Sequence, residues 1–220
     1  MSCAISNGTI ALDRQTEAKL VPFDFAALSS VTPSPNPKFQ GREAELNKMH
    51  DSLSARDTSQ HIVALWGLPG FGKTQLAIQY KLKYRGCYSF VLWADASFPG
   101  SIRECLCYLA KQVDCSARSV DEEHQLIMIA KKFLASSKSG DWLFVFDGYD
   151  SDYFDIREFL LVQDSSRGKY IITTIKEKIA LSFDGCEVEV HGVADDIGAQ
   201  ILLSGMRLKS PQGNGRFFRR

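Results

Sequence analysis

The stretch "HIVALWGLPGFGKTQLA" at residues 61–77 decides the fold. It opens with a continuous apolar run, which is typical of a strand buried on both faces of a sheet. It then leads into a segment, 73–84, whose apolar residues recur at helical spacing. The residues between strand and helix match G-x-x-x-x-G-K-[ST], which predicts a phosphate-binding loop rather than an ordinary Gly-rich turn. The pattern is met by Gly67, Gly72, Lys73 and Thr74.

Each residue type in this loop suits the binding of a nucleotide's phosphates. Glycine has no Cβ, so backbone amides can approach phosphate oxygens closely. The start of the helix adds free N–H groups and a positive dipole end. Lys73 is expected to reach the β- and γ-phosphates, and Thr74 to offer its hydroxyl to Mg²⁺. The expected contacts of the loop are Gly67, Leu68, Pro69, Gly70, Phe71, Gly72, Lys73, Thr74 and Gln75.

A second chemical signal is the stretch "WLFVFDGYD" at residues 142–150. Asp147 ends an apolar strand, where a carboxylate can hold Mg²⁺ through water beside the phosphate loop, although an Asp-Gly pair also forms simple turns. Asp150 either orients a water for attack on the γ-phosphate or is only a solvated acid in an acid-rich stretch. With the phosphate loop present, we take Thr74 and Asp147 as metal ligands, and Asp147 and Asp150 as catalytic residues.

Strands and helices alternate along the chain. Further strands are expected at 88–94, 170–174 and 187–190, and further helices at 41–54, 101–113, 121–137 and 194–206. This alternation predicts a three-layer α/β fold of the P-loop NTPase type, with a five-stranded, mainly parallel sheet. The spacing suits the strand order 5-1-4-3-2, in which strand 170–174 lies between the loop strand and the Asp147 strand. Thr173 and Thr174 are then expected near the γ-phosphate.

Two finer predictions concern single elements. Segment 187–190 alternates between apolar and polar residues, so it is expected to be a half-exposed strand at an edge of the sheet. Ser101 is expected to be the N-cap of the helix at 101–113, because serine side chains accept hydrogen bonds from the first free amides of a helix.

Composition narrows the class of protein. The 220 residues are 45% hydrophobic and 24% charged, which predicts a packed domain rather than disorder. The 26 basic and 26 acidic residues balance, so we expect neither nucleic acid nor an anionic membrane as partner. The six cysteines form no CxxC pair and the four histidines are scattered, so we expect no zinc site and a reducing compartment. Without a signal peptide or an apolar run of ~18 residues, we expect a cytoplasmic protein.

Three parts are expected along the chain. Residues 1–38 are expected to be a flank that ends in the Pro-rich linker "SSVTPSPNPK". Residues 39–192 are expected to form the nucleotide-binding domain. Residues 193–220 are expected to begin an adjoining helical region and to end in a basic tail.

Six stretches of the chain are similar to the motifs of one family. They are "FQGREAEL" (39–46), "GLPGFGKTQLA" (67–77), "YSFVLWADAS" (88–97), "LFVFDGYD" (143–150), "GKYIITT" (168–174) and "VEVHGVADDIGAQILL" (188–203). Over roughly residues 37–208 the chain resembles the NB-ARC nucleotide-binding domain of STAND-class signalling ATPases, especially that of fungal NOD-like proteins.

The resemblance implies contacts, cofactors and partners. It implies that Phe39, Gly41 and Arg42 contact adenine and ribose, and that the cofactors are ADP or ATP with Mg²⁺. It also implies a signalling switch in which ADP holds a closed state, while ATP opens the molecule and permits oligomerisation. The implied partners are further copies of the chain or related NOD-like proteins, in innate immunity or heterokaryon incompatibility.

Three departures from the family pattern shape the expected activity. Ile175 stands where the family commonly has an arginine that reads the γ-phosphate, and the adjacent Lys176 is expected on the opposite face. Gly148 replaces a second acid after the Mg²⁺ aspartate. The sequence ends before the family's proline-bearing helical motif and winged-helix portion, so we expect a truncated form that binds nucleotide more weakly. We therefore expect at most a slow ATPase.

Two other functions compete with the switch. A P-loop phosphotransferase for small molecules needs a mobile arginine-rich lid, and Arg157 and Arg167 are too isolated to form one. The Asp147 strand also comes late in the chain for that class. A nucleotide-free scaffold would interact through an exposed sheet edge or through its incomplete helical face. Saturable ADP binding that is lost in Lys73→Ala favours the switch, whereas fast transfer of phosphate to a metabolite favours the phosphotransferase. The absence of binding at millimolar nucleotide leaves the scaffold.

Overall fold

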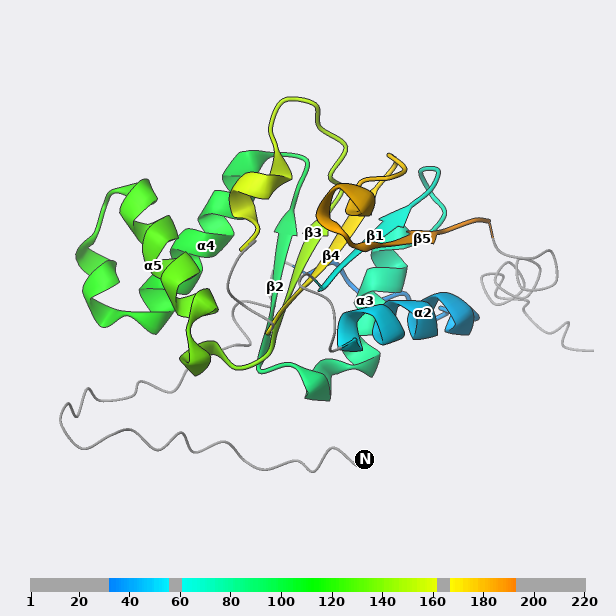
Figure 1. Cartoon of the computed structure of the whole chain (residues 1–220), viewed down its shortest axis with the longest axis horizontal. Coiled ribbons are helices and arrows are strands. Elements are labelled where there is room, and N and C mark those ends of the chain that lie inside the picture. The colour runs from blue at the N-terminus through cyan, green and yellow to red at the C-terminus, as the bar shows by residue number, and fades with distance from the viewer. Residues whose placement is uncertain (1–31, 56–60, 162–166, 193–220) are drawn as a thin grey trace, which may run out of the picture.

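Five parallel strands form one sheet in the order β2-β3-β4-β1-β5. A computed structural model of the chain describes residues 32–55, 61–161 and 167–192 (Figure 1). The strands are β1 (His61–Trp66), β2 (Phe90–Asp95), β3 (Trp142–Asp147), β4 (Gly168–Thr174) and β5 (Cys186–Glu189). The order is the predicted 5-1-4-3-2 read from the opposite edge, so the predicted fold is confirmed.

Helices cover both faces of this sheet. The helices α4 (Pro99–Val113) and α5 (Glu123–Ala135) lie on one side, and α2 (Glu43–Ser54) and α3 (Lys73–Lys83) lie on the other (Figure 1). Short 3₁₀ helices occupy the connections: η1 (Arg85–Cys87), η2 (Cys115–Ser119), η3 (Ser137–Ser139), η4 (Ile156–Phe159) and η5 (Ala180–Phe183). In the parts of the chain that the structure describes, no helix is long and apolar enough to cross a membrane.

One prediction about helix α4 is wrong and one about the C-terminal part is untested. Ser101 is not the N-cap, because α4 begins two residues earlier at Pro99 and its N-cap position is held by Phe98. Proline suits the first position of a helix, since its φ is already helical and the missing N–H has no partner there. The expected helix 194–206 and the basic tail lie outside the described residues.

Strand alternation divides the core into two layers. In β1, Ile62 and Ala64 pack with α4 and α5, whereas Val63 and Leu65 pack with α2 and α3. The strand is therefore buried on both faces, as its apolar run predicts. In contrast, β5 pairs only with β1, and only Val188 of its four residues is buried. This confirms the prediction of a half-exposed edge strand.

We expect Leu143→Ala to destabilise the protein by about 2–5 kcal/mol, because Leu143 is fully buried between β3 and the α2–α3 layer. The free energy of unfolding can be measured by urea denaturation. The matched control is Leu82→Ala on α3, where the leucine is 50% exposed. We expect the control to change stability by no more than about 0.5 kcal/mol. Equal losses in the two variants would contradict the two-layer core.

Candidate functional site

The predicted phosphate loop connects the end of β1 to the start of α3. Gly72 is the N-cap of α3, with a left-handed φ of +88° that L-residues rarely adopt. A Cβ at Gly72 or Gly70 would meet no atom within 4 Å, so the space beside the loop is open to a ligand. The first amides of α3 have no intrahelical acceptor and point out of the helix start. This arrangement suits an anion at the N-terminus of the helix.

The opposite end of the loop is packed tightly against the end of β5. A Cβ at Gly67 would lie 2.3 Å from the carbonyl oxygen of Val190, a backbone atom that has no freedom to move aside. The amide of Val190 also donates a 2.8 Å hydrogen bond to the carbonyl of Trp66. Glycine at position 67 is therefore required by the close approach of two backbone segments as well as by its φ of +148°.

Lys73 folds its side chain back over the loop. Its Nζ donates to the carbonyl oxygens of Gly67 at 2.8 Å and Leu68 at 3.0 Å. Partial burial lowers the pKa of Lys73 from its ordinary value, and the nearby carboxylates of Asp150 and Asp147 oppose this shift. The structure therefore places an ammonium group beside the loop and two carboxylates close to it.

Asp147 joins the phosphate loop to the centre of the sheet. Its Oδ1 accepts hydrogen bonds from the hydroxyls of Thr74, at 2.7 Å, and Thr173, at 2.6 Å. The hydroxyl of Thr173 in turn accepts from the amide of Gly148 at 2.8 Å. Three of the predicted site residues, from α3, β3 and β4, thus meet at one oxygen atom.

The residues at this meeting point fit a magnesium ion. Mg²⁺ usually takes one or two carboxylates from a protein and completes its octahedron with waters and substrate phosphates. The hydroxyl of Thr74 and the carboxylate of Asp147 lie in hydrogen-bond contact, so both oxygens can reach one cation. Among residues 32–55, 61–161 and 167–192, no cluster of three or more His, Cys, Asp or Glu side chains could hold a metal alone. A cation held by Thr74 and Asp147 would take its remaining ligands from waters and phosphate oxygens.

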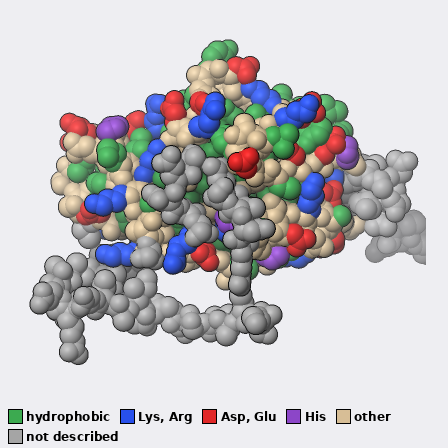
Figure 2. Space-filling model, viewed as in Figure 1, with side chains coloured by type: hydrophobic (Ala, Val, Ile, Leu, Met, Phe, Trp, Pro, Cys, Tyr) green, Lys and Arg blue, Asp and Glu red, His purple; other side chains and the backbone are tan. Residues whose placement is uncertain are grey.

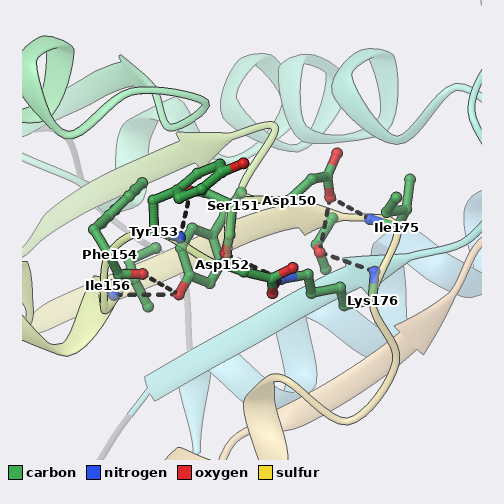
Figure 3. Close-up of polar contacts among 10 residues, drawn as sticks. Asp150, Ser151, Asp152, Tyr153, Phe154, Ile156, Ile175 and Lys176 are labelled. Atoms are coloured by element: carbon green, nitrogen blue, oxygen red, sulfur yellow. Dashed lines mark hydrogen bonds and ion pairs between the residues drawn. The ribbon is translucent and has the colours of Figure 1, made fainter.

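Asp150 holds the turn that follows β4. Its Oδ1 accepts from the hydroxyl of Thr174 at 3.0 Å and from the amide of Ile175 at 2.6 Å, while its other oxygen points away from these donors (Figure 3). Asp150 is exposed, but its carboxylate is hydrogen-bonded to the protein and is therefore not merely solvated. Its action on a water stays a prediction.

The cation nearest to this turn points elsewhere. Lys176 Nζ donates to the carbonyl of Ser151 at 3.0 Å and pairs with the carboxylate of Asp152 (Figure 3). The preceding Ile175 is 49% exposed and carries no charge. Neither Ile175 nor Lys176 therefore offers a positive group to the phosphate loop. This agrees with the expectation that Lys176, as the neighbour of Ile175, points to the opposite face.

The N-terminal motif contains Phe39, Gly41 and Arg42, and the contacts of Arg42 are to other parts of the protein. Arg42 has a φ of +69°, its Nη1 pairs with Glu45 at 2.8 Å, and its Nη2 donates to the carbonyls of Phe71, at 3.3 Å, and His191. Phe39 is half-buried against the layer formed by α2 and α3, and Gly41 is exposed. The structure thus places Arg42 against the phosphate loop, and the predicted contacts of all three residues with adenine and ribose stay predictions.

Gln75 binds the Pro-rich linker. Its Oε1 accepts from the amide of Asn36 at 2.7 Å, and its Nε2 donates to the carbonyl of Ser34 at 3.2 Å. Six residues further along α3, the buried Lys81 donates to the hydroxyl of Thr32 at 2.8 Å. The end of the linker is therefore docked along α3. The sequence did not predict this role, because the phosphate-loop motif indicated a nucleotide contact for Gln75.

Sequence reasoning also missed a cavity beside the site. A hollow of about 530 Å³ lies between the loop after β3, at 149–158, and the segment after β4, at 176–183. Its cations are paired within the wall, Lys176 with Asp152 and Arg157 with Asp155. The acid-rich stretch "DGYDSDYFD" was the only sequence signal for this wall.

Comparison with known proteins gives one family match. The NB-ARC domain family matches residues 42–196. No curated protein matches the chain.

Many solved structures are similar in fold, including the following three, all at low sequence identity. A STAND protein with a tetratricopeptide repeat sensor from Pyrococcus horikoshii is 15% identical over 82% of this chain and 27% of its own, with a TM-score of 0.51. Cdc6p from Pyrobaculum aerophilum is 17% identical over 82% and 52%, with a TM-score of 0.53. A chain of the Drosophila ORC bound to DNA is 13% identical over 89% and 55%, also at 0.53. The chain thus spans between about a quarter and about half of the proteins it resembles.

We expect Gly67→Ala to destabilise the protein by about 1–3 kcal/mol, because the new methyl group must displace the backbone at Val190. The same displacement should loosen the phosphate loop. Urea denaturation measures the first effect, and the rate of proteolysis at the loop measures the second.

The matched control is Gly86→Ala, since a Cβ at Gly86 meets nothing within 4 Å. We expect this variant to be neutral, or more stable by about 0.4–1 kcal/mol through the lower entropy of its unfolded chain. A Gly67 variant as stable as the Gly86 variant would show that the end of β5 is not fixed against the loop.

Proposed function

The chain belongs to the NB-ARC domain family, and from this premise we propose that it is the ADP- and ATP-binding module of a STAND-type signalling switch. Family membership supports a nucleotide-binding module. One observation carries the proposal furthest, which is the meeting of Thr74 and Thr173 at the carboxylate of Asp147 beside the phosphate loop. This contact connects the groups that would hold Mg²⁺ to the strand that would sense the γ-phosphate.

The phosphates would be held by the loop and the start of α3. The first-turn amides of α3 would supply hydrogen-bond donors, and the ammonium of Lys73, which lies beside the loop, would supply positive charge. To bind a phosphate, Lys73 would exchange its two carbonyl partners for phosphate oxygens, which are charged and therefore stronger acceptors. The adenine and ribose contacts of Phe39, Gly41 and Arg42 are proposed from the family resemblance alone.

Thr74 and Asp147 would hold Mg²⁺ beside the β- and γ-phosphates. The ion would neutralise charge that develops on the phosphates during transfer. Thr173 would keep the Asp147 carboxylate in place, since its hydroxyl donates to the same oxygen as Thr74 and is itself fixed by the amide of Gly148.

We propose that hydrolysis is slow or absent. Ile175 offers no charge to a γ-phosphate, and Lys176 is paired with Asp152 on the far side of the turn. Asp150 is occupied by two donors at one oxygen, so only its second oxygen is free to orient a water. Such a module would persist in its bound state and respond to nucleotide exchange rather than turnover.

The competing functions have less support. A small-molecule phosphotransferase would need mobile cations over the phosphates, whereas Arg157 is paired with Asp155 at 2.6 Å. The DNA in the Drosophila complex belongs to that protein. On the face shown in Figure 2, acidic and basic side chains of the described residues are intermixed, which offers no continuous positive surface for a nucleic acid. Assembly with further copies or with related proteins is proposed from the family alone.

We expect Lys73→Ala to weaken ADP binding by about 10- to 100-fold, since it removes a charge-assisted hydrogen bond to a phosphate. Calorimetry with ADP and ATP measures the affinity. The control is Lys83→Ala at the other end of α3, where the lysine pairs with Glu43 and should leave affinity unchanged. Equal affinity of the wild type and the Lys73 variant would overturn the proposed phosphate site.

We expect Asp147→Asn to remove the effect of Mg²⁺ on ATP affinity, because an amide is a much poorer ligand for this hard cation than a carboxylate. The measurement is ATP affinity with Mg²⁺ and with a chelator in its place. Asp51→Asn on the exposed face of α2 serves as control and should keep the full dependence on Mg²⁺. An Asp147 variant with the wild-type dependence would exclude this carboxylate as the magnesium ligand.

A further inference from the structure

We propose that Arg42 is a positioning residue that couples the phosphate loop to the chain as it leaves β5. The inference rests on the proposed nucleotide site, and it assigns Arg42 a role other than contact with adenine. It is carried by the hydrogen bonds of one guanidinium group to two backbone segments that lie far apart in the sequence.

The guanidinium of Arg42 bridges these two segments. Its Nη2 donates both to the carbonyl of Phe71, within the phosphate loop, and to the carbonyl of His191, which follows β5. Its Nη1 is held by the carboxylate of Glu45 at 2.8 Å, one turn further along α2. The side chain is only 10% exposed, so water competes weakly for its bonds to Glu45 and Phe71, whereas the bond to His191 lies at the surface. The planar group with its several donors is thereby fixed in one orientation.

A second contact joins the same two segments independently of Arg42. The backbone at Gly67 lies against the carbonyl of Val190, and the amide of Val190 donates to Trp66. The loop is thus attached to the end of β5 at its first residue through backbone contact, and near its last residue through Arg42. Because β5 is an edge strand that pairs only with β1, this double attachment fixes where the chain leaves the sheet.

A change in the conformation of the loop would therefore alter the position of residues 190–192. If a phosphate draws Lys73 away from the carbonyls of Gly67 and Leu68, the loop gains freedom at its start while Arg42 still holds it at Phe71. The end of β5 would follow the loop through the bridge. Arg42 would in this way transmit the occupancy of the phosphate site to whatever follows His191.

The test compares wild type, Arg42→Ala and Arg42→Lys with two probes, ADP and inorganic pyrophosphate. Pyrophosphate has no base or ribose, so it reports on the phosphate loop alone. Hydrogen exchange is followed at the amides of 67–74 and 188–192, with and without each probe. In the wild type we expect both probes to slow exchange in both segments.

In Arg42→Ala we expect ligand-free exchange at 188–192 to rise about tenfold, as after loss of a hydrogen bond to a charged group. The probes should still protect 67–74 but no longer protect 188–192. Affinity for ADP and for pyrophosphate should fall by the same factor. Arg42→Lys should behave like the alanine variant in exchange, since the one nitrogen of lysine replaces the two guanidinium nitrogens that hold Glu45 and the two carbonyls.

Three outcomes would overturn the inference. The first is a fall in ADP affinity without a fall in pyrophosphate affinity in Arg42→Ala, which would make Arg42 a base or ribose contact. The second is unchanged protection of 188–192 by the probes in Arg42→Ala. The third is wild-type exchange and affinity in Arg42→Lys. Arg103→Ala, which removes an exposed arginine from α4, is the control and should leave all readouts unchanged. Circular dichroism and urea denaturation verify that each variant is folded.

The failure of the proposed function would look different. If the wild type bound neither probe, the nucleotide site would be excluded. The ligand-free comparison would still decide whether Arg42 bridges the two segments, because that contact exists without a nucleotide. Unchanged ligand-free exchange at 188–192 in Arg42→Ala would then overturn the bridge as well.

Discussion

A single carboxylate oxygen, Oδ1 of Asp147, ties the candidate site together. The hydroxyl of Thr74 reaches it from the first turn of α3, and the hydroxyl of Thr173 reaches it from the end of β4. Since a carboxylate can only accept, both hydroxyls must donate to it, and each is thereby oriented. These two hydrogen bonds fix the start of α3 against strands β3 and β4. The buried layers on both faces hold those strands in place.

The parts of the fold that were predictable are those fixed by local pattern. The apolar run in β1 predicts burial on both faces, because successive residues of a strand point to opposite faces and those after His61 are all apolar here. The glycines and Lys73 predict the loop, since few other folds need that spacing. The position of Asp147 at a strand end, combined with the loop, predicts its meeting with Thr74. Even the position of β4 between β1 and β3 follows from element spacing.

What escaped prediction depends on contacts between distant segments. Gln75 lies in the loop motif, yet its side chain binds the linker, and no local pattern encodes a partner at Asn36. The hydrogen bonds of Arg42 to the carbonyls of Phe71 and His191 were also not predicted, because these residues are far apart in the sequence and meet only in the folded protein. The start of α4 was misplaced for a different reason. A serine cap and a proline first turn are both good helix starts, and sequence alone gave no reason to prefer Pro99.

The attachment of the linker to α3 has a mechanical consequence. The hydrogen bonds of Gln75 and Lys81 fasten the strand of chain at Thr32, Ser34 and Asn36 to the helix whose N-terminus forms the phosphate site. Tension from the chain before Thr32 would act first on the contact with Lys81 and then on the amide group of Gln75, one residue after Thr74. The residue that binds the linker, Gln75, and the proposed phosphate contacts therefore lie in the same first turn of α3. A force on the linker would consequently act on the phosphate site.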